Sequence, residues 1–282
     1  MGSSQSRSRQ RNTGRMNNSQ GPRLEDENSD SSTSDSEGSE MGSEIEESPT
    51  RYNSGLKEIK TIGKFYEEKV LKAPKEGSAL HPASAAYLER VSLFQGDITR
   101  LELDGIVNAA NRSLLGGGGV DGAIHSVAGP GLLEECRGLN GCLTGESKMT
   151  RGYNLPAQYV IHTVGPVYSS TGVDVKAAQL ASCYQTSLEV AVENGLRHIA
   201  FPSISTGIYS YPIVDATRIA LDTVRTYLDS EKGNKLERVV FVVWSDSDLA
   251  TYESLIPEYF PPVDESKDST AVPEKATTSE SS

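Results

Sequence analysis

Four consecutive glycines, Gly116–Gly119, constrain this chain of 282 residues more than any other feature. Glycine costs backbone entropy on folding, so a run is usually found where the backbone adopts positive φ or approaches a ligand closely. An apolar run begins at Ile106, before the glycines, and a helix-like pattern begins at Val120, after them. A strand, a glycine loop and a helix start direct free N–H groups toward an anion, typically a phosphate. The pattern therefore predicts a ligand-binding loop.

Polar residues on both sides of the glycines argue against an ordinary flexible turn: Asn108 and Asn111 precede them, and Asp121 and His125 follow. The Gly-Lys-Ser/Thr sequence of a P-loop is missing, and so is the later acidic residue of a dinucleotide-binding fingerprint. A carboxylate at Asp121 beside a phosphate loop suits sugar hydroxyls or a water molecule. The neighbouring sequence lacks the further carboxylates that would hold Mg²⁺, so no metal is expected.

The two ends of the chain differ sharply in composition from its middle. Residues 1–23 carry five arginines and no acid, residues 24–50 carry ten acids and no base, and residues 263–282 are almost devoid of apolar side chains. Such segments bury too little surface to offset their ordering entropy, so 1–51 and 263–282 are predicted to be disordered tails. The net charge of −12 mostly reflects these tails and says little about partners.

The first residues, Met1-Gly2-Ser3-Ser4-Gln5-Ser6, match the pattern for N-myristoylation at Gly2, and several arginines follow. One acyl chain together with basic residues predicts a weak membrane tether. An ordinary Gly/Ser-rich tail is the alternative interpretation.

The three cysteines, Cys136, Cys142 and Cys183, form no CxxC pair. Neither a zinc site nor a disulfide framework is therefore expected, and a reducing, intracellular compartment fits best. No apolar run approaches the roughly 20 residues that cross a bilayer.

Apolar periodicity predicts strands alternating with helices. Strands are expected at 89–94, 105–108, 148–154, 158–164, 198–202 and 238–244, and helices from Val120 and at 131–139, 175–193, 212–228 and 246–259. Segment 55–72 predicts a peripheral helix broken near Gly63. This alternation is typical of an α/β fold, in which ligands bind beyond the carboxyl ends of the strands. Four segments fall there: 96–97, 108–121, 203–209 and Trp244.

Four motifs occur in order along the chain: Gly96-Asp97-Ile98-Thr99, Asn108-Ala-Ala-Asn111, Gly116–His125 and Ser205-Thr-Gly-Ile-Tyr209. Together they resemble the macro domain, most closely the MacroD-type branch that hydrolyses ADP-ribose conjugates. The resemblance covers 91–262, with 52–90 as a helical N-terminal extension. It implies a three-layer α/β/α sandwich around a mixed, largely parallel sheet.

The resemblance also implies a binding role for each motif. Asp97 would accept a hydrogen bond from the adenine amino group, with the Ile98 backbone beside it. Trp244 would stack on adenine, a departure from the family in side-chain type, although a core aromatic at a strand end is the alternative. Loop residues would wrap the diphosphate and distal ribose. The implied substrate-binding residues are Asp97, Ile98, Asn111, Gly117, Gly118, Gly119, Val120, Asp121, Ser205, Thr206, Gly207, Ile208, Tyr209 and Trp244.

For catalysis the resemblance implies Asp121, Asn111 and His125. Asp121 would position or deprotonate the water that attacks the distal ribose C1″; alternatively a substrate phosphate activates the water and Asp121 orients the ribose. Asn111 would hold a ribose hydroxyl. His125, four residues after Asp121, lies on the same helix face and either supports it or is structural. Asn108 is expected to tie strand to loop through its backbone, outside the site.

The expected function is hydrolysis of mono-ADP-ribose from acidic side chains of proteins, with deacetylation of O-acetyl-ADP-ribose as an additional reaction. The alternatives are a non-catalytic ADP-ribose reader and a membrane-tethered adaptor. The expected partners are ADP-ribose and mono-ADP-ribosylated proteins, without a cofactor or sequence-specific nucleic acid. A monomer in the cytoplasm, the nucleus or both is expected.

Overall fold

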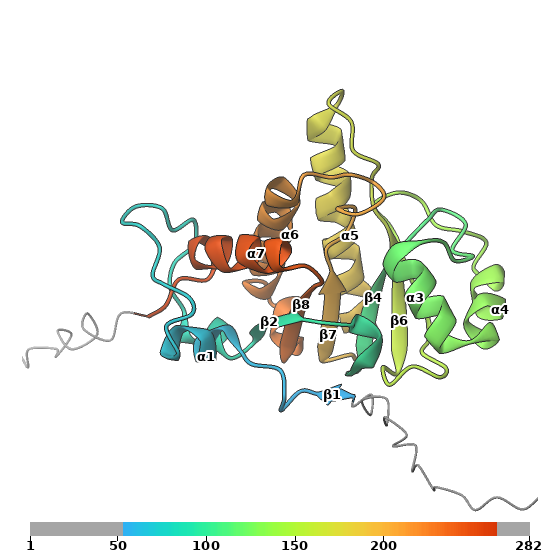
Figure 1. Cartoon of the computed structure of the whole chain (residues 1–282), viewed down its shortest axis with the longest axis horizontal. Coiled ribbons are helices and arrows are strands. Elements are labelled where there is room, and N and C mark those ends of the chain that lie inside the picture. The colour runs from blue at the N-terminus through green and yellow to red at the C-terminus, as the bar shows by residue number, and fades with distance from the viewer. Residues whose placement is uncertain (1–52, 264–282) are drawn as a thin grey trace, which may run out of the picture. The chain divides into compact units, whose positions relative to one another are not determined.

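The computed structural model describes residues 53–263 (Figure 1). The predicted tails, 1–51 and 263–282 apart from Val263, and the predicted myristoylation at Gly2 lie outside the described residues. Among the helices of this described part, none is long and apolar enough to cross a membrane.

A six-stranded sheet organises the fold, with strand order β2-β8-β7-β4-β6-β5. The strands are β2 Val91–Gln95, β4 Gly105–Ala110, β5 Ser147–Arg151, β6 Tyr159–Val164, β7 His198–Pro202 and β8 Arg238–Val243. Every pairing is parallel except that of the edge strand β5 with β6. A separate two-stranded parallel sheet joins β1 Ser54–Gly55 to β3 Leu101–Glu102.

Helices cover both faces of the sheet because successive strand residues point to opposite sides. In β8, Val239 and Phe241 belong to a core cluster with α5 Val173–Glu193, α6 Ile213–Leu228 and α7 Asp246–Tyr259. Val240 and Val242 belong to a second cluster with α3 Gly119–Ala128 and α4 Pro130–Gly138. Figure 1 shows α3 and α4 side by side, apart from the other three helices. The predicted α/β/α sandwich with a mixed, largely parallel sheet is confirmed.

Most predicted elements are present with shifted ends. The strand expected at 105–108 continues to Ala110, and the helix expected from Val175 begins at Val173. β8 ends at Val243, so Trp244 lies just beyond the strand. The interior strands β7 and β8 are largely buried and apolar on both faces, which made them visible in the sequence.

The prediction for segment 55–72 was wrong. Only Ile62–Glu67 is helical (α1), and Gly63 lies inside this helix instead of breaking it. The Thr61 side chain caps the helix by accepting a hydrogen bond from Lys64 N–H. A Cβ at position 63 would lie 3.1 Å from the Leu88 carbonyl oxygen, so this glycine permits close packing.

The rest of the N-terminal segment is largely irregular and packs into the core. Its second helix, α2 Ala85–Leu88, has four residues. Ile62 and Leu71 are buried in the cluster beneath α5–α7, and Ile59 is buried in the cluster beneath α3 and α4. The segment is therefore more closely integrated than a peripheral helical extension.

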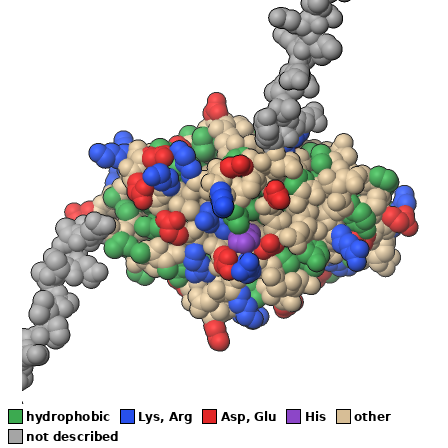
Figure 2. All heavy atoms as spheres, turned by 90° about the horizontal axis from the view of Figure 1, so that it is seen from below, with side chains coloured by type: hydrophobic (Ala, Val, Ile, Leu, Met, Phe, Trp, Pro, Cys, Tyr) green, Lys and Arg blue, Asp and Glu red, His purple; other side chains and the backbone are tan. Residues whose placement is uncertain are grey.

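One surface of the described residues carries basic and acidic side chains interspersed, without a large patch of one sign (Figure 2). Some of the exposed charges form ion pairs, such as Arg197 Nη1 with Glu237 Oε1 at 2.7 Å. Such pairs contribute little to stability.

Candidate functional site

A cavity of about 670 Å³ opens at the carboxyl ends of β2, β4, β7 and β8. Every predicted substrate-binding residue lines this cavity, from Asp97 and Ile98 to Trp244. Of the predicted catalytic residues, Asn111 and Asp121 line it and His125 does not. The structure thus brings together four segments that are far apart in the sequence, while their roles remain predictions.

The glycine loop has the backbone geometry that its sequence predicts. Gly116 and Gly119 adopt φ of +84° and +63°, a conformation that residues other than glycine rarely adopt. A Cβ at Gly122 would lie 2.5 Å from the Gly117 carbonyl oxygen, so the loop packs directly on the first turn of α3. Gly118 caps α3 without any side-chain hydrogen bond, which leaves the first N–H groups free for a ligand.

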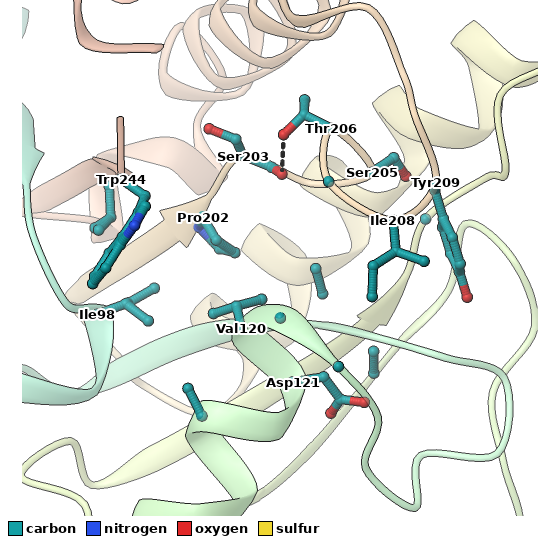
Figure 3. Close-up of a pocket in the computed structure, with 18 of the residues that line it drawn as sticks. Ile98, Val120, Asp121, Pro202, Ser203, Ser205, Thr206, Ile208, Tyr209 and Trp244 are labelled. Atoms are coloured by element: carbon teal, nitrogen blue, oxygen red, sulfur yellow. Dashed lines mark hydrogen bonds between the residues drawn. The ribbon is translucent and has the colours of Figure 1, made fainter. Parts of the chain in front are cut away.

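A second loop, Ser203–Tyr209, faces the glycine loop across the cavity (Figure 3). Ser205 has φ of +68°, an uncommon conformation for a residue other than glycine. The Thr206 hydroxyl donates a hydrogen bond to the Ser203 carbonyl at 2.9 Å, which tightens the turn. A Cβ at Gly118 would meet Ile208 Cδ1 at 2.9 Å, so the two loops nearly touch.

No lysine or arginine of the described residues lines the cavity, whereas three aspartates do: Asp97, Asp121 and Asp248. An anionic ligand would therefore depend on backbone N–H groups and the positive end of α3. This arrangement suits a diphosphate held between two loops.

Trp244 and Ile98 lie at one end of the cavity, whereas Asp121, Ile208 and Tyr209 lie at the other (Figure 3). Trp244 is 74% exposed, which rules out the alternative of a core aromatic. Its indole face is available to a flat apolar group such as a base. Asp97 uses Oδ1 to accept hydrogen bonds from Thr99 N–H and Oγ1, at 2.9 and 2.7 Å. Its other oxygen, Oδ2, lies 3.7 Å from Arg100 Nε in an ion pair.

Asp121 is only 3% exposed and has two differently placed oxygens. Oδ1 accepts a hydrogen bond from Asn108 Nδ2 at 2.7 Å and lies 3.5 Å from His125 Nε2. Oδ2 lies beside Gly117, where a Cβ would be 3.1 Å away, and no described residue donates to it. Burial raises the pKa of Asp121 above its ordinary value, and Asn108 and His125 partly counteract this. The carboxylate is thus anchored through one oxygen and offers the other to the cavity.

Asn111 contributes to the shape of the loop as well as to the cavity wall. Its Nδ2 donates to the Gly116 carbonyl at 2.7 Å, and its Oδ1 accepts from Ser113 N–H at 3.0 Å. A Cβ at Gly117 would lie 3.1 Å from both Asn111 Nδ2 and Asp121 Oδ2. The two side chains therefore converge on one point.

Asn108 does not line the cavity, as expected, but its side chain makes a contact that the sequence did not suggest. The side chain is fully buried and donates a hydrogen bond to Asp121 Oδ1. Asn108 Nδ2 also lies 3.1 Å from His162 Nδ1. In the sequence, His162 appeared only as one residue of an apolar strand. No spacing signal links these positions, since they come together only when β4 and β6 pair.

Three side chains of the described residues, His125, Cys136 and His162, lie close enough to form a metal-ligand set. Both ring nitrogens of His162 are already engaged, by Asn108 and by Thr150 Oγ1 at 2.9 Å. Burial raises the pKa of the Cys136 thiol to about 11, far from the thiolate that binds metals. The set therefore fits a metal centre poorly, and Cys136 Sγ instead lies in hydrogen-bond contact with His162 Nε2, at 3.6 Å. All three cysteines are free and buried, so the described part contains no disulfide.

The Macro domain family model matches residues 107–220, which contain both Asp121 and the glycine loop. A macro domain-containing protein of Chlorobaculum tepidum is 58% identical over 166 residues, covering 59% of this chain and 95% of that relative. This chain belongs to the macro domain family.

Further similarity reaches named enzymes and a ligand complex. ADP-ribose glycohydrolase MACROD2 of Mus musculus is 49% identical over 217 residues. This match covers 77% of the chain but only 44% of that relative, so the chain spans less than half the length of the mouse protein. The Trypanosoma brucei macrodomain in complex with ADP-ribose matches with a TM-score of 0.61 and 42% identity, over 72% of this chain and 77% of that one.

Proposed function

We propose that this macro domain binds ADP-ribose and hydrolyses mono-ADP-ribose from modified acidic side chains of proteins. The observation that carries the proposal is Asp121, a buried carboxylate with one anchored and one free oxygen at the end of the cavity opposite Trp244. A module that only binds the nucleotide has no need of such a group. The names of similar proteins, ADP-ribose glycohydrolase MACROD2 among them, support the same class of reaction.

In the proposed complex, ADP-ribose would extend along the cavity from Trp244 to Asp121. Adenine would stack on Trp244 with its amino group near Asp97, and the diphosphate would lie between the two loops. The distal ribose would then reach Asp121, Asn111 and Tyr209. A bound ADP-ribose complex of the similar Trypanosoma brucei macrodomain supports this assignment.

In the proposed reaction, Asp121 Oδ2 holds a water molecule against C1″ of the distal ribose. The water oxygen bonds to C1″ as the bond from C1″ to the acyl oxygen breaks, and the side chain departs as a carboxylate. The water proton passes to Asp121 or to a substrate phosphate, and then to solvent. Desolvation makes Asp121 a stronger base than an exposed aspartate, because its pKa is raised. Deacetylation of O-acetyl-ADP-ribose at the same site is part of the proposal.

A non-catalytic reader is the second candidate. Backbone N–H groups of the two loops can hold the diphosphate without a lysine or arginine in the cavity, so ADP-ribose can bind whether or not a reaction follows. The test uses the full chain with a glutamate-linked mono-ADP-ribosylated protein and with O-acetyl-ADP-ribose. Release of free ADP-ribose over many turnovers supports the hydrolase. Tight ADP-ribose binding in calorimetry with no release from either substrate would establish the reader.

We also propose residence in the cytoplasm, the nucleus or both, with a weak membrane tether through myristoylated Gly2. The sequence pattern at the N-terminus supports the tether. Intact-mass measurement of protein made in eukaryotic cells tests the tether, since an N-terminus without the acyl mass rules it out.

A further inference from the structure

A row of buried polar side chains lies behind Asp121, outside the cavity. Asn108 on β4 and His162 on β6 occupy directly paired positions of adjacent strands, so their side chains share a face of the sheet. Thr150 on the neighbouring strand β5 continues the row. Asn108 and His162 are fully buried, and Thr150 is 2% exposed.

The Asn108 amide fixes the direction of the hydrogen bonds in the row, because its NH₂ group lies against both Asp121 and His162. An ionised carboxylate only accepts hydrogen bonds, so the Asn108 atom 2.7 Å from Asp121 Oδ1 must be the NH₂ group. The same NH₂ group lies 3.1 Å from His162 Nδ1, which must then be an acceptor. The ring proton is therefore on His162 Nε2, which donates to Thr150 Oγ1 at 2.9 Å. Thr150 in turn donates to the Arg151 carbonyl at 3.2 Å.

The His162 ring stays neutral in this setting. Burial, together with the neighbouring His125, lowers the pKa of His162 to about 3. A neutral acceptor fixes the Asn108 amide without placing a positive charge near Asp121. A cation there would lower the pKa of Asp121 and weaken it as a base.

We propose that Asn108 and His162 are positioning residues: the row fixes the Asp121 carboxylate so that Oδ1 is anchored and Oδ2 faces the substrate. The inference deepens the proposed hydrolase function and rests on it. Among the described residues, Asn108 supplies the one side-chain hydrogen bond to the Asp121 carboxylate, and His162 prevents the Asn108 amide from flipping. The other titratable groups facing Asp121 are His125 on its own helix and Cys136 on α4.

The activity test uses variants that remove one hydrogen-bonding group of the row at a time. Asn108→Leu keeps the branched shape of the side chain and removes the donor. We expect about a 10²-fold loss in kcat, with little change in ADP-ribose affinity, because small misplacements of a catalytic group are costly. The acid limb of its pH–rate profile should move to higher pH, because the hydrogen bond that lowers the pKa of Asp121 is lost. Cys183→Ala, which alters a buried residue in the core cluster on the opposite face, should leave kcat and the profile unchanged.

Two variants at His162 distinguish positioning from packing. Asn in His162→Asn can place its oxygen where Nδ1 accepts, whereas Gln in His162→Gln reaches only the Nε2 position. We expect His162→Asn to retain most of the turnover and His162→Gln to lose most of it. Equal losses in the two, or wild-type kcat and pH profile in Asn108→Leu, would overturn the proposal.

Nitrogen-15 NMR of His162 in the wild-type protein tests the row independently of activity and of how the variants fold. We expect a neutral ring protonated at Nε2 from pH 5 to 8. Protonation at Nδ1, or titration within this range, contradicts the assignment. If the wild-type protein releases no ADP-ribose while His162 shows the expected tautomer, the hydrolase proposal fails and the row loses its catalytic meaning but not its structure.

Discussion

Two buried charges, Asp121 and Arg225, are treated very differently by this fold. Arg225 is 1% exposed, and every part of its guanidinium has a partner. Nε donates to Asp229 at 3.1 Å, Nη1 to the Tyr259 carbonyl and Nη2 to the Pro82 carbonyl, both at 2.8 Å. The Tyr87 ring lies 4.3 Å from its guanidinium carbon. Arg225 thus joins α6 to the C-terminal end of α7 and to the N-terminal segment.

Within the described part of the chain, by contrast, the Asp121 carboxylate has one side-chain hydrogen bond, to Oδ1, and Oδ2 has none. A buried charge is costly unless it is fully paired, so an incompletely paired one reduces stability. The comparison teaches that complete satisfaction marks a structural charge, whereas incomplete satisfaction at a cavity marks a charge kept for a ligand or a reaction. Four predictions test this distinction.

The largest effect is expected for Asp121→Asn. The variant keeps an oxygen that can accept from Asn108 but removes the charge, so turnover should fall by about 10²–10⁴-fold. ADP-ribose affinity should be retained or improved, because a negative charge beside the diphosphate is lost. Steady-state release assays and calorimetry measure the two quantities. Asp248→Asn removes another carboxylate that lines the cavity and should leave turnover near wild type.

Arg225→Met should act on stability instead. Two backbone carbonyls and Asp229 lose their charged donor, so the free energy of unfolding should fall by about 3 kcal/mol. Urea denaturation measures it, with Arg218→Met as the control on the same helix. Arg218 is 44% exposed and pairs with Glu258, so its loss should cost little. Equal losses for the two variants would contradict the structural role of Arg225.

Trp244→Ala should weaken ADP-ribose binding about tenfold, since stacking of a base on an aromatic side chain contributes about 1–3 kcal/mol. Turnover at saturating substrate should change little, because Trp244 and Asp121 lie at opposite ends of the cavity. Leu143→Ala removes an exposed apolar side chain away from the cavity and serves as control. Unchanged affinity in Trp244→Ala would remove the indole from the adenine site.

The smallest effect is a pH dependence of stability. Burial raises the pKa of Asp121 in the folded protein above its ordinary value of 3.8, so folding disfavours its ionised form. Wild-type stability relative to Asp121→Asn should therefore fall as pH rises from 3.8 through the raised pKa, and then stay constant. Denaturation of both proteins at a series of pH values shows it. The opposite slope would mean that the native state stabilises the carboxylate.

Local patterns predicted much of the fold and of the cavity wall. The four glycines at 116–119 predicted a loop with positive φ, which Gly116 and Gly119 adopt. The strand predicted at 238–244 was visible as a nearly continuous apolar run. Because parallel strands end at the same sheet edge, the loops that follow them were expected to meet there.

What escaped prediction depends on contacts between distant segments. His162 in Tyr159–Val164 looks like any polar residue in an apolar strand, and its partner Asn108 is 54 residues away. Gly63 looked like a helix breaker because spacing does not reveal that Leu88 packs against it. Asn111 was assigned to the ribose, but the hydrogen bonds that also make it a loop brace appear only in three dimensions.

The most direct test of the central claim is single-turnover release of ADP-ribose from a glutamate-modified protein, with enzyme in excess and well below the melting temperature. This measurement isolates the chemical step from substrate binding and product release. The account predicts that Arg225→Met, though less stable, releases ADP-ribose at close to the wild-type rate. Asp121→Asn should bind the modified protein but release ADP-ribose from it at least about 10²-fold more slowly than wild type. Wild-type release by Asp121→Asn would contradict the account.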